Sequence, residues 1–335
     1  MKTAQPQFDI VVAAHNRPDA LSAAIASVVH QSRPDWRLLV IGDACNAQTV
    51  AVLTEFQDER IHFVNLPTWC GEQAVPNSVG LNALSAPYLA LLNHDDVWMP
   101  DHLALAARHL HNGYEFVRMR SAFAGQVTWR DGAVKLDFAH VSALNTNFAS
   151  CLRGGSADFE PASSWVFTRS LWQAVGNWHP ARTLHRAPIE DWLLRAWRQR
   201  PRTISAPECT VLNIRTYWTT AKTDVAYASH SPEYLTLLRQ VADHSGSLRE
   251  RLDACPTALP VNAPVGSRAL LHRIEKHLYL VWGIDLILVR QRLRGEPRGA
   301  YLAHLVFKRT GRSLPPPPDV AGLQRYVDES VRQWK

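Results

Sequence analysis

Short apolar runs alternate with amphipathic segments along the first hundred residues. The run Phe8–Ala14 is rich in β-branched residues, which is typical of a strand, and Leu21, Ile25, Val28 and Val29 then repeat at helical spacing. The alternation continues with predicted strands at Arg37–Ile41, Ile61–Asn65 and Tyr88–Leu92 and predicted helices at Thr49–Phe56, Val75–Leu84 and Asp101–Leu110. Strands that recur with helices between them predict an α/β fold, with a mostly parallel sheet covered by helices on both faces.

The pattern changes after about residue 112. Two alternating segments, Val127–Arg130 and Ala133–Phe138, flank an Asp131-Gly132 dipeptide, which predicts a hairpin with a tight turn. A helix at Ile189–Arg198 and a strand at Thr210–Ile214 follow, and these elements extend the predicted sheet. We therefore expect one domain over residues 1–230, with halves at 1–112 and 113–230.

The remainder, residues 231–335, is predicted to be a basic and mainly helical C-terminal region. It contains an apolar run at Leu278–Val289 with basic residues on both sides, and a stiff spacer at Pro315–Pro318. The apolar residues after the spacer share one face of a final helix; they are Val320, Leu323, Val327, Val331 and Trp334.

Composition indicates a folded protein without a membrane span. Apolar residues make up 46% and charged residues 20% of the 335 residues. We find no run of the roughly 18 to 20 apolar residues that cross a bilayer, and the first eight residues lack the apolar core of a signal peptide. The five cysteines are scattered, without the spacing of a zinc site, and suit reduced thiols. The sequence thus predicts a cytoplasmic location.

The positive charge is concentrated near the C-terminus. The segment Val261–Lys335 holds thirteen Lys and Arg residues against six Asp and Glu residues, whereas the rest of the chain holds 23 against 24. One interpretation places residues 268–312 on an anionic membrane surface, peripherally at the inner face of the plasma membrane. In the other, these helices pack on the first domain, or form a homo-oligomer, and their charges are solvated. No nucleic-acid-binding module accompanies the charge, so no nucleic-acid partner is expected.

Two adjacent acids, Asp95 and Asp96, directly follow the apolar strand Tyr88–Leu92. Ligands bind at the carboxyl edge of open α/β sheets, and carboxylate oxygens are the ligands that Mg²⁺ or Mn²⁺ prefers. Such an ion bridges the oxygens of a diphosphate. The alternative is that both acids only cap the helix that follows Pro100.

Four ordered segments carry a resemblance to a known family. They are Val11–Arg17, Ile41–Asn46, Pro76–Leu81 and Asn93–Pro100. Together they resemble the nucleotide-binding and acidic motifs of the family 2 glycosyltransferases, and the resemblance runs from about Phe8 to Arg200. It implies a GT-A fold, a nucleotide-sugar donor bound by residues 1–112 and an acceptor bound by residues 113–230.

The resemblance also assigns roles to single residues. It implies donor-binding roles for Ala14, Asn16, Arg17, Asp43, Asn77 and Asp95. Asp96 would be the direct ligand of Mn²⁺ or Mg²⁺, with Asp95 beside it. Gly42, Ser78 and Asn93 depart from the family pattern, and Asn93 removes one acid from the metal motif.

A second acid pair, Glu190 and Asp191, opens the helix at Ile189–Arg198. It resembles the family signature in which the Asp is the catalytic base, with Glu190 steering beside it. Inverting transfer requires a carboxylate that removes the proton of the attacking hydroxyl. Acids are also favoured in the first turn of any helix by its dipole, which is the structural alternative. Arg195, one turn on, is predicted to be a partner of these acids.

Trp165 and Trp178 lie between the two acid pairs, in a segment that resembles the acceptor side of the family. Aromatic rings stack on sugars, so both are candidates for the acceptor pocket, although most tryptophans belong to the core. The resemblance predicts transfer of a single sugar, with inversion, from a UDP-, dTDP- or GDP-linked donor to a glycan or lipid-linked acceptor. The alternatives are a catalytically silent GT-A domain that binds a membrane or partner, and a nucleotidyltransferase.

Overall fold

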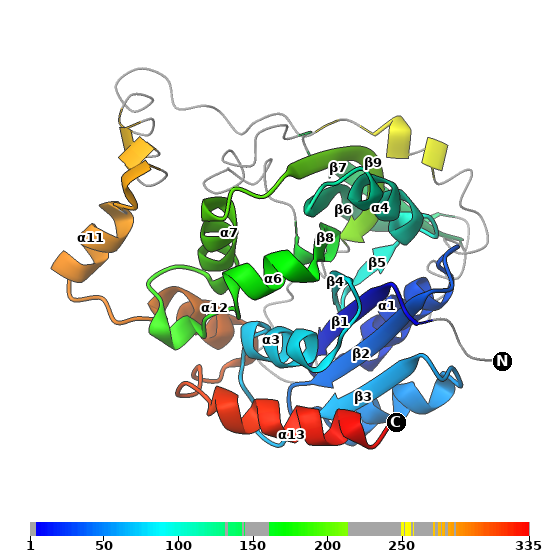
Figure 1. The fold of residues 1–335 in the computed structure, drawn as a ribbon, viewed down its shortest axis with the longest axis horizontal. Helices are drawn as coiled ribbons and strands as arrows, with labels where there is room; N and C mark the ends of the chain where they lie inside the picture. Colours follow the sequence, from blue (N-terminus) through cyan, green and yellow to red (C-terminus); the bar gives the residue numbers. More distant parts are fainter. Residues whose placement is uncertain are drawn as a thin grey trace.

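The computed structural model describes residues 5–130, 133–142, 144, 161–213, 249–250, 252–255, 257, 271, 274–275, 277–278, 281–284 and 286–334. Its strands form a single sheet with the order β3-β2-β1-β4-β8-β6-β9-β5, and β7 pairs with β6 (Figure 1). The strands are β1 (Phe8–Ala14), β2 (Trp36–Gly42), β3 (Ile61–Asn65), β4 (Tyr88–Asn93), β5 (Asp96–Trp98), β6 (Phe116–Arg130), β7 (Ala133–Val141), β8 (Trp165–Thr168) and β9 (Thr203–Asn213). The α/β fold predicted from the sequence is therefore confirmed.

The sheet has a parallel part and a mixed part. Strands β3, β2, β1 and β4 are parallel neighbours, as the sequence predicted. Beyond β4 the sheet is mixed: β8 runs antiparallel to β4 and β6, β9 is parallel to β6, and β5 is antiparallel to β9. The hairpin of β6 and β7 was predicted too short, because β6 already begins at Phe116 and β7 continues to Val141.

Helices cover both faces of the sheet, and alternate side chains of β1 point into the two cores between the sheet and these helices. Phe8, Ile10 and Val12 belong to the core under α1 (Pro18–Val29) and α4 (His102–His111). Val11 points to the opposite core, which also holds residues of α3 (Ala74–Ala83), α6 (Arg169–Val175) and α7 (Pro188–Arg198). Side chains alternate across a strand, so a strand that is buried along its whole length requires a layer of helices on each face.

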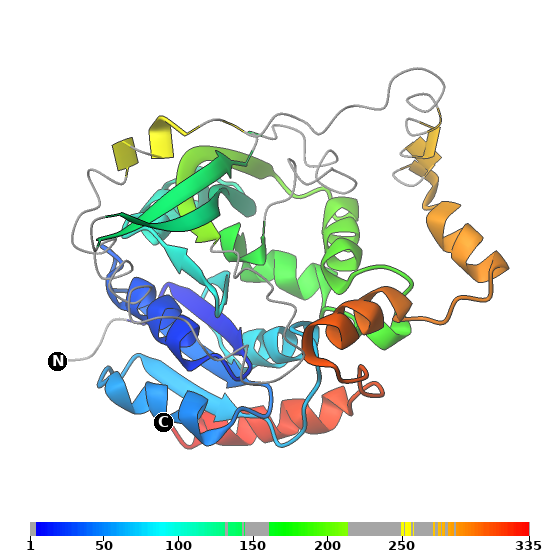
Figure 2. The same cartoon turned by 180° about the vertical axis from the view of Figure 1, so that it is seen from behind.

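The final helix, α13 (Val320–Arg332), packs against α3 at the outer surface of the first half of the chain (Figure 2). Leu323 and Val327 are buried in the same core as α3, and the Gln324 side chain donates to the Val79 carbonyl at 3.1 Å. The Trp334 ring stacks on His62 with centroids 4.3 Å apart. The predicted apolar face of this helix is thus confirmed, and its partner is the first half of the chain.

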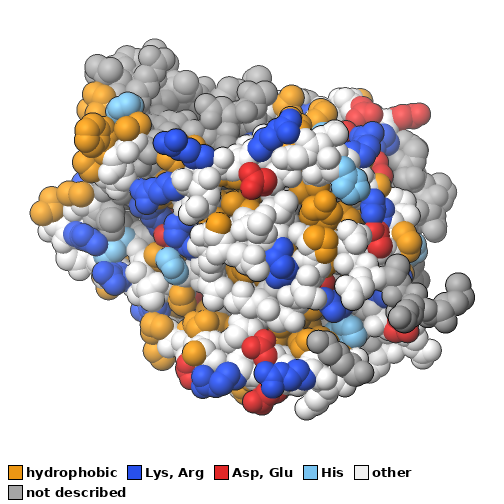
Figure 3. Space-filling view, in the orientation of Figure 1, with side chains coloured by type: hydrophobic (Ala, Val, Ile, Leu, Met, Phe, Trp, Pro, Cys, Tyr) orange, Lys and Arg blue, Asp and Glu red, His pale blue; other side chains and the backbone are white. Residues whose placement is uncertain are grey.

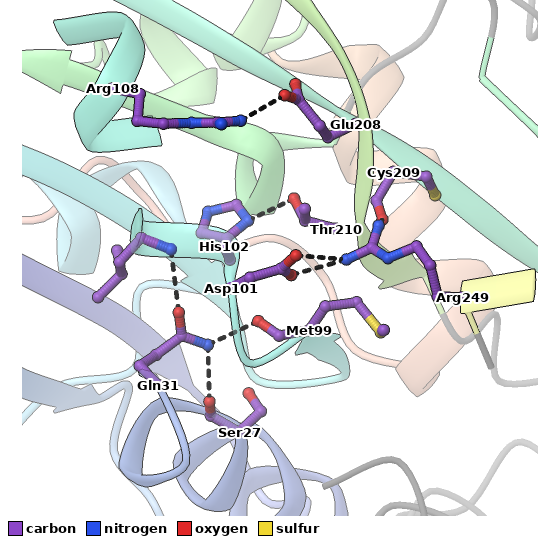
Figure 4. Close-up of polar contacts among 11 residues, drawn as sticks. Ser27, Gln31, Met99, Asp101, His102, Arg108, Glu208, Cys209, Thr210 and Arg249 are labelled. Carbon is purple, nitrogen blue, oxygen red and sulfur yellow. Dashed lines mark hydrogen bonds and ion pairs between the residues drawn. The ribbon is translucent and has the colours of Figure 1, made fainter. Parts of the chain in front are cut away.

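The segment that carries Asp95 and Asp96 is fixed by a polar network at the start of α4 (Figure 4). The Gln31 side chain donates to the Ser27 and Met99 carbonyls at 3.0 and 2.8 Å and accepts from the Leu103 amide at 3.0 Å. Nearby, the buried His102 ring bonds the Thr210 hydroxyl at 2.8 Å. These contacts tie α1 and β9 to the β5–α4 corner, which directly follows the two acids.

Two further helices, α11 (Leu286–Leu293) and α12 (Ala300–Thr310), precede α13, and α11 projects from the body in both views (Figures 1 and 2). In the part of the chain that the structure describes, no helix combines the length and the apolar character that a bilayer span needs. The Asp131-Gly132 turn, Ile214 and much of residues 231–270 lie outside the described residues. The division at residue 230 stays a prediction.

Candidate active site

Three parallel strands end at one edge of the sheet. The register pairs Ala14, the last residue of β1, with Gly42 of β2, and Ala13 with Asn93 of β4. The loops that follow these strands therefore begin side by side. They carry the polar residues that the sequence singled out, and the carboxyl edge of such a sheet is where ligands bind.

The loop after β1 is joined to the loop after β4 by an ion pair between a buried arginine and a partly exposed aspartate. Arg17 is 4% exposed, and its Nη1 lies 2.7 Å from Asp95 Oδ2. Burial works to raise the pKa of Asp95, but the neighbouring His94 and Arg17 outweigh it and hold that pKa below its ordinary value. Asn16 adopts a left-handed backbone conformation (φ 43°), and its side chain accepts from the Asn46 amide at 2.8 Å. The ion pair and this hydrogen bond therefore fix the conformation of the loop after β1 without a ligand.

Asp43, directly after β2, is 5% exposed. Its two carboxylate oxygens accept from the amides of Cys70 and Gly71 at 2.5 and 2.9 Å. Burial raises the pKa of Asp43 in spite of these amides. In this structure Asp43 holds the 70–71 loop in place.

Asp96 lies at the start of β5 and is 1% exposed. Its Oδ1 accepts from the side-chain amide of Asn213 at 2.8 Å, and its Oδ2 accepts from the side-chain amide of Asn93 at 2.9 Å and from the Ser163 hydroxyl. Burial, followed by the charge of Asp95, raises the pKa of Asp96 to about 7. The residue that departs from the family pattern, Asn93, is thus a partner of Asp96.

The two acids differ in how well they fit a divalent ion. Asp95 is 29% exposed and is held in its charged form, as a metal ligand must be. A cation at Asp96 would have to displace one of three neutral donors. Among the described residues, no group of three or more His, Cys, Asp or Glu side chains is arranged to hold a metal. Of the two acids, Asp95 is therefore the better placed to meet a cation, whereas the resemblance implied Asp96 as the direct ligand, and the metal site stays a prediction.

The second acid pair lies in the first turn of α7, which begins at Pro188. Asp191 is 15% exposed, and its Oδ2 lies 2.9 Å from Arg195 Nε and 3.0 Å from His179 Nδ1. Arg195 also donates to the carbonyls of Val175 and Asn177 at 2.6 and 2.7 Å. The predicted partnership of Arg195 and Asp191 is confirmed, and Glu190 is exposed beside it.

A cluster of aromatic rings joins the two acid sites. The Trp165 and Trp192 rings stack with centroids 5.7 Å apart, and Trp178 lies 6.3 Å from Trp192. Trp192 follows Asp191 in the chain, and Trp165 lies two residues after Ser163, the partner of Asp96. Both acids are therefore attached to one core.

A sequence model of the family described as glycosyl transferase family 2 matches residues 9–176, half of the chain. The chain belongs to this family. It is 28% identical over 161 residues to the putative teichuronic acid biosynthesis glycosyltransferase TuaG of Bacillus subtilis (strain 168), covering 44% of this chain and 61% of TuaG. It is 30% identical over 96 residues to the UDP-Glc:alpha-D-GlcNAc-diphosphoundecaprenol beta-1,3-glucosyltransferase WfgD of Escherichia coli, covering 29% of this chain and 38% of WfgD.

The fold is also similar to that of a solved structure, S. aureus TarS 1-349 in complex with UDP-GlcNAc. The TM-score is 0.52, with 13% sequence identity over 98% of this chain and 92% of that chain. At this identity the likeness concerns the fold alone. The chain spans less than two thirds of the two curated relatives.

In this family 2 glycosyltransferase chain, the predicted donor-binding residues are not all at the strand edge. Asn16, Arg17, Asp43 and Asp95 lie in the loops that follow β1, β2 and β4. Ala14 ends β1, and its carbonyl accepts from the Asp43 amide at 2.7 Å. Asn77 lies within α3 and is 3% exposed, so the structure gives its side chain a place in the interior.

The proposed acceptor role of the two tryptophans needs correction. Trp165 and Trp178 are 1% and 2% exposed and pack against Trp192, so neither ring offers a face to a sugar in this structure. Large aromatic rings tend to be buried, and this explains the positions of both tryptophans better than the resemblance of their segment to the acceptor side of the family.

Sequence reasoning missed three residues: His179, Ser163 and Asn213. Ser163 and Asn213 reach Asp96 only through the pairing of strands distant in sequence, for which the sequence holds no local signal. His179 could have been suspected, because it follows a buried tryptophan and precedes a proline in a loop beside the second acid pair.

Proposed function

We propose that this protein is an inverting glycosyltransferase that moves a single sugar from a nucleotide-diphosphate sugar, UDP-linked, to a hydroxyl of a glycan or glycolipid. The observation that carries the proposal is the strand edge at which Arg17, Asp43 and Asp95 are brought together from three loops of a family 2 domain. The UDP-Glc in the name of WfgD and the UDP-GlcNAc in the TarS structure favour a UDP-sugar, and the names of TuaG and WfgD favour a glycan or glycolipid acceptor.

The donor is bound by charge and hydrogen bonds at this edge. Arg17 provides a buried positive charge at the edge proposed for the diphosphate, and the Asp43 carboxylate is an acceptor that suits the imide N–H of a uracil. Asp95, with Asp96 behind it, is the proposed holder of Mn²⁺ or Mg²⁺. When bound there, the ion would neutralise charge on the departing diphosphate.

Transfer is a single displacement at the anomeric carbon, with the Asp191 carboxylate as the proposed base that takes the proton of the acceptor hydroxyl. The acceptor oxygen forms a bond to the anomeric carbon while the bond from that carbon to the diphosphate breaks, and the nucleoside diphosphate leaves with the electron pair. The acceptor proton must leave as the oxygen attacks, which makes a base necessary. Asp191 is held by Arg195 and exposed enough to meet an acceptor, and Glu190 lies beside it to steer that acceptor.

The C-terminal region is proposed to place the enzyme on an anionic membrane surface, where a lipid-linked acceptor resides. Figure 3 shows apolar side chains gathered over the part that carries α11, with basic side chains beside them. The described apolar residues of this surface are 42% to 82% exposed; they are Leu271, Ile274, Val281, Trp282, Ile284, Val289, Leu293 and Phe307. Arg290 and Arg294 are 62% and 74% exposed beside them, and each lies near a glutamate, Glu275 at 3.1 Å and Glu296 at 3.9 Å. The exposed apolar side chains with basic residues nearby are the features that support this proposal.

The test has two stages. A thermal-shift screen against UDP, dTDP, GDP and their sugars, with and without Mn²⁺, is expected to give stabilisation by UDP compounds. Release of UDP from the stabilising donor is then compared for wild type, Asp191→Ala and a matched control, Asp253→Ala, which removes an exposed aspartate. We expect UDP release to fall by about 10²-fold or more in Asp191→Ala only. Equal release by both variants would remove the base assignment, and a wild type that neither binds nor releases a nucleotide would favour a silent domain.

A further inference from the structure

The loop after β3 brings a tryptophan ring to Asp43. Trp69 directly precedes Cys70, whose amide donates to the Asp43 carboxylate at 2.5 Å. The Trp69 ring also stacks with the His15 ring, and His15 Nδ1 donates to the Asp43 carbonyl at 2.7 Å. Both rings are therefore held close to the carboxylate that is proposed to accept from the imide N–H of a uracil.

The neighbours of the Trp69 ring leave part of its surface uncovered. The centroid of the His15 ring is 5.9 Å from that of Trp69, and the Arg312 Cζ is 5.7 Å from it. A close stack in the same molecule is tighter, since the Arg60 Cζ lies 3.7 Å from the centroid of the Trp36 ring. Trp36 is buried, whereas Trp69 is partly exposed. Ring surface therefore remains at Trp69 for a further planar group.

The C-terminal segment that carries Arg312 lies directly against this loop. Trp69 packs against the small core to which α12 and Leu314 contribute. Gly71 has a left-handed backbone conformation (φ 71°), and a Cβ at this position would lie 2.9 Å from the Pro315 Cδ. The two segments therefore meet more closely than a side chain at residue 71 would allow. The residues that follow Arg312 thus fix its segment to the donor edge.

Residues 181–182 anchor both the loop and the C-terminal segment. The Arg182 side chain donates to the carbonyls of Leu314 and Pro315, and the Ala181 amide donates to the Glu72 carboxylate at 2.9 Å. The position of Arg312 over Trp69 is thus built from three separate parts of the chain. Only one of them, the 69–72 loop, lies within residues 9–176, which match the family.

We propose that Trp69 and Arg312 form a platform on which the nucleobase of the donor stacks, and that the C-terminal segment thereby completes the donor site. This inference rests on the proposed function, in which Asp43 accepts from the base. A base held at Asp43 is within reach of Trp69, because the next residue, Cys70, bonds the same carboxylate. Aromatic rings and guanidinium planes both stack on bases.

The platform and the carboxylate have different consequences for donor binding. Every base has a flat aromatic face, so stacking on Trp69 adds affinity with little selection among bases. The carboxylate of Asp43 selects a base that offers an N–H donor. A contact that is the same before and during the reaction changes KM and leaves kcat unaltered. The platform is therefore expected to set how tightly the donor binds, whereas the rate of the chemical step depends on other residues.

The experiment measures binding to the full chain by calorimetry, with UDP and dihydro-UDP as probes. In dihydro-UDP the carbon–carbon double bond of the uracil ring is saturated, which removes the flat aromatic face and keeps the imide N–H and the diphosphate. The variants are Trp69→Leu, Trp69→Phe and Arg312→Gln. The controls are Arg325→Gln and Tyr326→Leu, which change exposed side chains of α13.

Wild type is expected to bind UDP about 10-fold or more tightly than dihydro-UDP. In Trp69→Leu the affinity for UDP should fall by about 10-fold or more, and the preference over dihydro-UDP should disappear because the stacking ring is gone. Trp69→Phe keeps a ring and should retain most of the preference. Arg312→Gln should lower the affinity for UDP by about 3-fold or more, with KM for UDP-GlcNAc raised and kcat unchanged. Both controls should behave as wild type does.

The preference for UDP is a ratio measured on one variant, so it does not depend on how much of that variant is folded. The wild-type preference in Trp69→Leu would overturn the platform, and so would wild-type UDP affinity in Arg312→Gln. A preference that Trp69→Phe loses as fully as Trp69→Leu would also overturn it. These results leave the glycosyltransferase proposal intact as long as wild type binds UDP. A wild type that binds neither UDP nor UDP-GlcNAc would instead overturn the proposed function.

Discussion

The ion pair between Arg17 and Asp95 should make a measurable contribution to both the fold and the site. Replacing Arg17 by Met keeps most of the length of the side chain and removes its charge. Loss of one partner of a buried pair costs about 3 to 5 kcal/mol. Asp95 is 29% exposed, so water can solvate the carboxylate that is left behind, and we expect the smaller loss of about 2 to 3 kcal/mol in the free energy of unfolding.

Urea denaturation of a double-mutant cycle measures the pair itself. Arg17 makes other contacts as well, and the cycle of Arg17→Met, Asp95→Asn and the double variant subtracts them. In the Asp95→Asn background the cost of Arg17→Met should fall by about 1.5 kcal/mol or more, because the carboxylate is no longer left unpaired. The affinity for UDP-GlcNAc, measured by calorimetry, should fall in both single variants.

The refuting result is additivity. The pair carries no coupling if the loss of unfolding free energy in the double variant equals the sum of the losses in the two single variants within about 0.5 kcal/mol. The link between the loops after β1 and β4 would then not be the ion pair seen here.

Four further outcomes are expected. UDP release should fall on treatment with EDTA and return with Mn²⁺ in wild type, with no such return in Asp95→Asn. Trp192→Ala should lower the free energy of unfolding in urea by about 3 to 5 kcal/mol, since this ring is fully buried among other aromatic rings. Trp282→Ala should weaken cosedimentation with phosphatidylglycerol vesicles at low salt, whereas Tyr326→Ala, an exposed ring on α13, should not. The pKa of Asp96 is raised from 3.8 to about 7 in the folded state, so the folded state binds this proton more tightly than the unfolded state does. The stability that Asp96 contributes should therefore decline as the pH rises from about 4 to 7. The difference in free energy of unfolding between wild type and Asp96→Asn, measured across this range, should show that decline.

The first half of the fold was readable from the sequence because its signals are local. Each parallel strand is an unbroken apolar run, and each helix after it repeats apolar residues on one face, as Leu21, Ile25 and Val28 do in α1. The end of an apolar run also marks the carboxyl edge, which is why the sequence could assign residues to the loops after β1, β2 and β4, while their roles stay predictions.

The second half was less readable because its contacts depend on strand order. Strand β8 lies next to β4, and β9 next to β6 and β5, although these neighbours are far apart in the sequence. The pairing of Asn213 with Asp96 follows from the register of β9 against β5, which is set by long-range packing. Burial of Trp165 and Trp178 likewise depends on how α7 packs, and a motif carries no information on that.

The two acid sites share a core, and this has a consequence for how substitutions act. Ser163 bonds Asp96 and the carbonyl of Ser163 accepts from the Trp98 ring at 2.7 Å, while Trp165, two residues on, stacks on Trp192 beside Asp191. A cavity at position 192 would let α7 shift relative to β8, and α7 carries the proposed base whereas β8 borders the donor edge. Trp192→Phe, which leaves a smaller cavity, should therefore lower kcat for UDP release by more than it weakens UDP-GlcNAc binding. If Trp192→Phe instead weakens UDP-GlcNAc binding and leaves kcat unchanged, the core around Trp192 supports the donor-binding edge and not the position of Asp191.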